Sequence, residues 1–366
     1  MSAESPAPEP GTSEPVAPEP IVPEPGTPEP VAPEPAAELP VKQGLIARLG
    51  GKRLAIIAAL ALVLAGSLAL WMTYLTTRQP ITKILPPAQA VLAGTLQPRF
   101  LFSINGVTEP YGVAVTPEGD RIYVVEGQGE RKIRAFDREG KQIAAFAAPG
   151  SDDTGRMPVY VAVDNAGLVY VVDRMRESVD VFDAGGNYQS SIKSPFPERW
   201  FPLGIQVDGN DLLVTEVTKG KHRVLRMSKD GTLLSEFGSE GQDVGQLEWP
   251  QATATDARGR VFVSDGNNAR VQAFDRNGKV LFSVTGFNLP RGVEVDGLQR
   301  LHVVDTIGQQ VSVFDVSKDD VKPLFTFGEV GVGDGEFSFP NCIAIDDTDR
   351  LYVTDRLNNR VQVWVY

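Results

Sequence analysis

From residue 99 onward, the apolar residues of this chain occur in short runs that are typical of β-strands. Six segments, 40 to 50 residues apart, each begin with a proline and continue into an apolar strand, a turn and a second apolar strand ending in Asp or Glu. Further runs rich in β-branched and aromatic residues follow, which favours strands. Four strands per repeat of this length predict a β-propeller. The initial prolines are Pro110, Pro158, Pro202, Pro250, Pro290 and Pro340, and the terminal acids are Glu126, Asp173, Glu216, Asp265, Asp305 and Asp355.

The sixth repeat stops at Tyr366, after its third strand, and the missing strand is found upstream. FLFSING (100–106) matches VLFSVTG (280–286), the fourth strand of the fourth repeat. We therefore predict that 100–106 pairs with the C-terminal strands and closes the ring, which would cover an exposed sheet edge. The expected fold is an all-β, six-bladed propeller over residues 99–366.

Residues 54–75 form an uninterrupted apolar run of a different kind, with no charged side chain. As a helix, 22 residues would span roughly 33 Å, enough to cross a bilayer. Four basic residues lie in the juxtamembrane segment 41–53, against two in the linker 76–98. The positive-inside rule then predicts a single-pass protein of the cell membrane, with a cytoplasmic N-terminus and an extracytoplasmic propeller.

The first 40 residues hold thirteen of the 28 prolines and eight glutamates, mostly in Pro-Glu-Pro triplets, and no Lys or Arg. Such a segment has little to bury and is predicted to be a disordered tail, available to a cytoplasmic partner. It contributes −8 of the formal charge of −12. The remainder is mildly acidic, which disfavours nucleic acid as a partner.

The repeats resemble those of the NHL-repeat family. The matching text includes GNNARVQAFD (266–275), LNNRVQVWV (357–365) and the spacers between blades at 237–250 and 327–340. The resemblance covers residues 99–366 and implies a six-bladed propeller. With its expected membrane anchor, the chain resembles bacterial extracytoplasmic NHL sensor domains, although the family also includes lyases and RNA-binding regulators. Its peptide-amidating lyases hold zinc with several histidines, which this chain cannot supply.

Few residues are available for metal or nucleophilic chemistry. One cysteine and two histidines exclude a disulfide framework and a three-histidine metal centre, so no metal or other cofactor is expected. The six strand-terminal acids are interpreted as structural hydrogen-bond acceptors. His302 replaces an aromatic core residue of other blades, His222 is expected to be exposed, and Cys342 is expected to be buried and inert.

Departures from the repeat supply the candidate ligand-binding residues. On the innermost strands, Gln206 and Glu294 stand where the other blades have Ala, and they are expected to face the channel. Tyr111, Arg291 and Asn341 directly follow blade prolines and should lie near one channel mouth, where Arg291 could pair with Glu294.

The loop 193–202 supplies two further candidates, Phe196 and Trp200, because aromatic residues on a proline-stiffened loop are common in recognition surfaces. We favour a binding function, as a sensor or scaffold for an extracytoplasmic protein, peptide or glycan, over an enzymatic one. The alternative is a lyase or lactonase whose channel holds a divalent metal on Glu294, Gln206 and Asn341.

Overall fold

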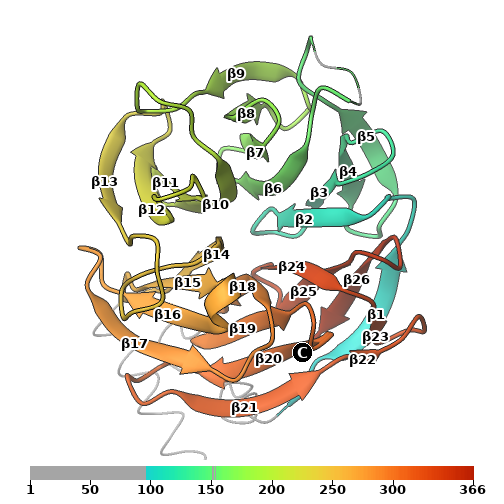
Figure 1. Cartoon of the computed structure of the whole chain (residues 1–366). Helices are drawn as coiled ribbons and strands as arrows, with labels where there is room; N and C mark the ends of the chain where they lie inside the picture. Colours follow the sequence, from blue (N-terminus) through green and yellow to red (C-terminus); the bar gives the residue numbers. More distant parts are fainter. Residues whose placement is uncertain (1–95, 151, 153) are drawn as a thin grey trace, which may run out of the picture. The chain divides into compact units, whose positions relative to one another are not determined.

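A computed structural model describes residues 96–366 except 151 and 153, all within the second of two units, residues 79–366. The strands form six four-stranded antiparallel sheets around a central channel (Figure 1). This confirms the all-β six-bladed propeller. The innermost strands begin at the six blade prolines: β2 (Pro110–Val115), β6 (Pro158–Val163), β10 (Pro202–Asp208), β14 (Pro250–Thr255), β18 (Pro290–Val295) and β24 (Pro340–Ile345).

The other strands of each blade follow outward in chain order. The second strands are β3 (Arg121–Glu126), β7 (Val169–Asp173), β11 (Asp211–Glu216), β15 (Val261–Asp265), β19 (Arg300–Asp305) and β25 (Arg350–Asp355). The third strands are β4 (Ile133–Asp137), β8 (Ser178–Phe182), β12 (Arg223–Ser228), β16 (Arg270–Phe274), β20 (Gln310–Asp315) and β26 (Arg360–Val365). The fourth strands are β5 (Gln142–Phe146), β9 (Tyr188–Ile192), β13 (Leu233–Phe237), β17 (Val280–Thr285) and β21 (Lys322–Phe327).

The sixth blade is completed by β1 (Arg99–Ile104), as predicted. β1 pairs antiparallel with β26, from Arg99 opposite Val365 to Ile104 opposite Val361. The Phe100 ring packs edge-on against Trp364, with 5.9 Å between ring centroids. The sheet order β1-β26-β25-β24 therefore joins the two ends of the propeller in one blade.

Every innermost strand has a register shift within three residues of its proline. A bulge with one unpaired residue bends a strand and re-aims its side chains. The shift recurs in all six blades, so the residues that follow the prolines occupy equivalent positions at one end of the channel.

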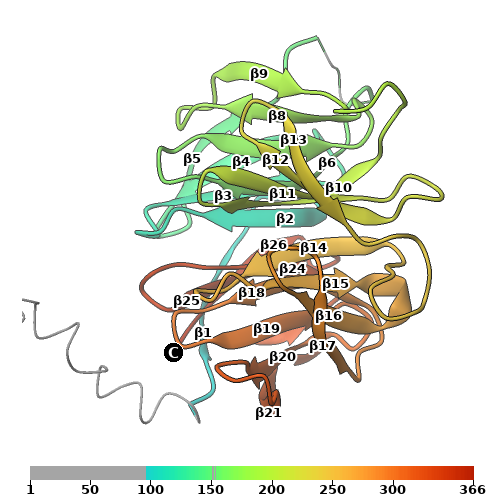
Figure 2. The same cartoon turned by 90° about the vertical axis from the view of Figure 1, so that its left-hand side faces the viewer.

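The sheets pack face to face, and Figure 2 shows their strands running across the thickness of the disc. Residues 122–126 of β3 are buried on both faces of the sheet, which explains why the second strands are continuously apolar. Blade contacts are closest at small residues. A Cβ on Gly204 would lie 2.0 Å from the Gln251 carbonyl oxygen, so the backbones could not approach as they do with a larger residue.

Short elements in the loops were not predicted: the 3₁₀ turn η2 (Gly266–Asn268) and the parallel pair β22 (Glu329–Val330) and β23 (Glu336–Phe337). Within the described residues, no helix is long and apolar enough to cross a membrane. The predicted membrane helix 54–75, the tail 1–40 and most of the linker lie outside the described residues.

Candidate ligand-binding site

We call the face on which the innermost strands begin the mouth face. A pocket of about 150 Å³, here called the mouth pocket, opens there. The predicted residues Tyr111, Arg291 and Asn341 all line it. The rest of its wall consists of Met157, Val159, Tyr160, Arg174, Leu203, Trp249 and Gln251.

Hydrogen bonds connect three blades at the mouth pocket. Arg291 Nη1 donates to Asn341 Oδ1 (2.6 Å), and Asn341 Nδ2 donates to the Tyr111 carbonyl oxygen (2.7 Å). The expected pairing of Arg291 with Glu294 is wrong, because the Arg291 side chain reaches sideways to the next blade while Glu294 lies deeper in the channel.

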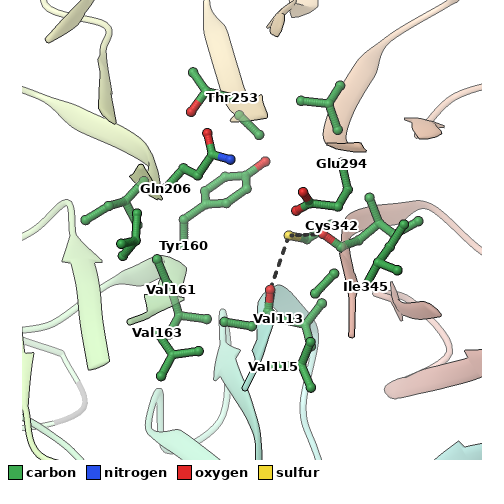
Figure 3. A pocket seen from close by; sticks show the side chains of 18 residues that line it. Val113, Val115, Tyr160, Val161, Val163, Gln206, Thr253, Glu294, Cys342 and Ile345 are labelled. Carbon is green, nitrogen blue, oxygen red and sulfur yellow. Dashed lines mark hydrogen bonds between the residues drawn. The ribbon is translucent and has the colours of Figure 1, made fainter. Parts of the chain in front are cut away.

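Below the mouth pocket lies a second cavity of about 200 Å³, the channel cavity, which contains Gln206 and Glu294 as predicted. Figure 3 shows that their polar ends project into it together with the Tyr160 hydroxyl and Thr253, whereas valines line the other side. Tyr160 lines both cavities.

The channel cavity favours a neutral carboxyl group. Burial raises the pKa of Glu294 to about 7, more than the hydrogen bond from the Val295 amide (3.2 Å) lowers it. Gln206 Nε2 donates to Thr255 Oγ1 (3.3 Å), while its Oε1 has no partner among the described residues. The Thr253 and Tyr160 hydroxyls are also unpaired there, which suits a cavity filled by water.

The three ligands of the metal-enzyme alternative are not brought together. Asn341 lines the mouth pocket, not the channel cavity, and both atoms of its amide are engaged. No group of three or more His, Cys, Asp or Glu side chains in the described part of the chain is arranged to hold a metal ion.

The loop 193–202 contributes less to the surface than expected. Trp200 is 1% exposed, and its indole Nε1 donates to the Glu177 carbonyl oxygen (2.6 Å). Trp200 is therefore a core residue, and its assignment to a binding surface is wrong. Phe196 is half-buried against the core, with the Arg223 guanidinium 4.2 Å from its ring centroid. Neither residue lines the mouth pocket or the channel cavity.

The strand-terminal acids are structural, as predicted. All six are buried, and the fourth and sixth blades show the same arrangement. Asp355 Oδ2 accepts from Asn358 Nδ2 (2.9 Å) and Arg360 Nε (2.7 Å), and its Oδ1 accepts from the Ser338 amide (2.7 Å). The guanidinium of Arg360 also donates to the Glu336 carbonyl oxygen in the preceding spacer (2.8 Å). The shared NxRVQ pattern, at 268–272 and 358–362, thus ties each of these spacers to its blade.

The remaining reactive groups are buried. Burial lowers the pKa of His302 to about 4, and its Nε2 lies 2.7 Å from the Tyr366 hydroxyl. Burial raises the pKa of the Cys342 thiol to about 12. These positions agree with the expected core roles. His222, expected to be exposed, is buried instead, because the loop containing it folds back and the Trp249 amide donates to its Nδ1 (3.3 Å).

Exposed apolar side chains distinguish the two faces of the propeller. Five of them, 36–57% exposed, stand on the mouth face just before a blade proline or just after a strand-terminal acid: Met175, Trp249, Ile307, Phe339 and Leu357. Hydrogen bonds place these two kinds of position together, as from the Gly266 amide to the Trp249 carbonyl (3.3 Å). Within residues 96–366, the turns that join strands on the opposite face carry no large exposed apolar side chain, although the exposed Leu96 precedes β1 at that face. Aligning the residues beside the prolines and acids across all blades could have revealed this surface.

Comparison with known proteins agrees with this architecture. The NHL repeat family matches residues 337–364, which cover the β24, β25 and β26 part of the sixth blade. The chain carries an NHL repeat. It is 26% identical over 250 residues to the E3 ubiquitin-protein ligase NHLRC1 of Rattus norvegicus, covering 61% of this chain and 60% of the relative. NHL repeat-containing protein 3 of Mus musculus is 23% identical, covering 47% and 40%. The chain thus spans about three fifths or less of these curated relatives.

Solved structures show the same fold in distant proteins. A streptogramin B lyase superposes with a TM-score of 0.55 at 13% identity, covering 73% of this chain and 97% of the lyase. The virginiamycin B lyase of Staphylococcus aureus gives 0.53 at 15% identity, covering 74% and 99%. At these identities the likeness concerns the propeller alone.

Proposed function

We propose that this NHL-repeat propeller is a binding module that recognises a protein or peptide through its mouth face. The observation that carries this proposal is that Met175, Trp249, Ile307, Phe339 and Leu357 all stand exposed on the mouth face, whereas the described turns between strands on the other face carry no such side chain. Grouped apolar side chains exposed on one face are typical of interaction sites.

The chemistry of the face favours a protein over a glycan. Trp, Met and Arg are the residue types enriched in protein interfaces. Here Trp249 and Met175 flank Arg174, whose guanidinium lies 5.8 Å from the Trp249 ring centroid. The mouth pocket then gives the centre of the interface a recess into which a partner's side chain or chain end can enter.

A photoreactive amino acid incorporated in living cells tests this proposal. Introduced at Ile307 or Leu357, it should form discrete cross-links to a partner that mass spectrometry identifies. The matched controls are Thr348 and Asn277, which are exposed on turns of the opposite face. Equal cross-linking from both faces, or none from the mouth face, would contradict the proposal.

Membrane attachment completes the proposal: residues 54–75 anchor the chain and hold the propeller outside the cytoplasm. The uncharged apolar run and its basic N-terminal flank support this arrangement. Cysteine labelling with a membrane-impermeant maleimide tests it, because the single native cysteine, Cys342, is buried. Thr348→Cys should be labelled in intact cells and Ser13→Cys only after lysis. The reverse pattern would place the propeller in the cytoplasm.

A further inference from the structure

Two arginines of the mouth pocket differ from most other buried or half-buried arginines in the described part of the propeller. Arg223, Arg270 and Arg360 each pair with the acid of their own blade, at 2.7 Å between Nε and a carboxylate oxygen. Arg174 and Arg291 line the mouth pocket and form no ion pair with any described Asp or Glu. The wall of the pocket contains no carboxylate at all.

Arg174 directly follows Asp173, the buried acid of the second blade, and its side chain turns toward the channel mouth. Its Nε is buried with no hydrogen-bond partner among the described residues. Burial lowers the pKa of this guanidinium. The equivalent residue of the sixth blade, Arg356, has a counter-charge, because its Nε lies 3.5 Å from Glu109 Oε2. Arg174 has none.

Arg291 approaches the pocket from the fifth blade. Its Nη1 is occupied by Asn341 Oδ1, and that hydrogen bond orients the guanidinium across the mouth. Its Nε is buried and unpaired within the described part of the chain, like that of Arg174. A buried N–H without an acceptor is costly, and a charged one more so. The described residues therefore leave both guanidinium charges uncompensated, and a negatively charged ligand in the pocket would compensate them.

We infer that the mouth pocket binds an oxyanion, a carboxylate or a phosphate group, between Arg174 and Arg291. The inference rests on the proposed function and specifies what the partner places at the centre of the mouth face. Guanidinium groups bind carboxylate and phosphate oxygens through charge-assisted hydrogen bonds, often two at a time. A volume of about 150 Å³ is enough for such a group. Trp249 and Tyr111 add aromatic walls to the pocket beside the two guanidinium groups.

Trp249 provides a reporter for this binding. It lines the pocket and is partly exposed, whereas the two other described tryptophans, Trp200 and Trp364, are buried. We propose to titrate the purified full-length chain with acetate, inorganic phosphate or chloride at constant ionic strength, following tryptophan fluorescence and the thermal midpoint. Trp249→Phe should remove the fluorescence change without removing the thermal shift.

Acetate, phosphate or both should give a saturable response, and chloride should not. The anion that binds with the higher affinity identifies the chemical group on the partner. Arg174→Met and Arg291→Met should each weaken binding about tenfold or more, since each removes a charged donor. Arg258→Met is the matched control, because Arg258 is exposed on the opposite face. If either Met variant melts abnormally in chloride, the Lys variant replaces it and should bind detectably but more weakly than wild type.

An equal, non-saturating response to all three anions, or affinities unchanged in both arginine variants, would overturn the inference. The cross-linking experiment separates it from the proposed function. Cross-links without anion binding would refute the oxyanion site and support the protein-binding interface. Anion binding without cross-links would support a site for a small anion and refute the proposed protein partner.

Discussion

Replacing Glu294 by Gln should stabilise the propeller at neutral and alkaline pH and have little effect in acid. The Glu294 carboxyl borders the channel cavity deep inside the propeller, and burial raises its pKa to about 7. In the unfolded chain this carboxyl titrates near 4.5. The folded state thus holds the proton more tightly, and stability is lost as the pH rises from about 4.5 to 7.

The size of the effect follows from the difference between the two pKa values. At 1.36 kcal/mol per pH unit, the ionised carboxylate costs about 3 kcal/mol above pH 7. Water in the cavity hydrates part of this charge, so about 3 kcal/mol is the upper end. For a domain of this size it corresponds to a rise in the melting midpoint on the order of 5–10 °C. Glutamine has nearly the same shape and no charge, so the cavity is not otherwise changed.

Thermal and urea unfolding of wild type and Glu294→Gln between pH 4 and pH 8.5 would measure the difference. Subtracting the two curves removes contributions shared by all other groups. Glu139→Gln, on an exposed turn between β4 and β5, controls for the loss of one negative charge. A stability difference that is the same at every pH, or a Glu139→Gln variant with the same pH dependence, would contradict a raised pKa of Glu294.

Three further predictions concern the scaffold. Deleting residues 99–104 should lower the melting midpoint and broaden the transition, because β26 loses its partner; a midpoint and cooperativity like those of wild type would contradict ring closure by β1. Asp355→Ala should cost about 3 kcal/mol or more in denaturant unfolding because Arg360 becomes a buried unpaired charge, whereas Asp334→Ala, at an exposed position, should cost little. The Cys342 thiol should react with an aromatic disulfide reagent only at the rate of unfolding, since burial raises its pKa to about 12; rapid reaction in the native state would refute this.

Much of the fold could be predicted because the same residue types mark the strand boundaries in all six repeats. Proline cannot donate to a sheet ladder and begins each innermost strand, and an acid ends each second strand. The match between 100–106 and 280–286 located the closing strand for the same reason. Gln206 and Glu294 were found in the channel because each breaks an alanine position shared by the other blades.

The errors concern groups whose surroundings come from distant parts of the chain. The proline-stiffened loop with its aromatic residues predicts a surface position for Trp200, yet the partner of its indole is the Glu177 carbonyl in the turn between β7 and β8. The importance of Arg174 is not visible in the sequence, because its neighbours do not show whether another blade places a carboxylate beside it. The basic residues around His222 predict an exposed position. Its burial depends on the Trp249 amide, which is 27 residues away in the sequence.

The closing strand also determines how the propeller bears tension. Everything before residue 99 connects to the disc through β1, which is the outermost strand of its sheet. A pull from that side is resisted first by the hydrogen bonds between β1 and β26 and by the contact of Phe100 with Trp364. The strand that keeps the ring shut is therefore the first to be loaded when the chain is stretched, and its release would free the C-terminal blade edge before any other sheet is disturbed.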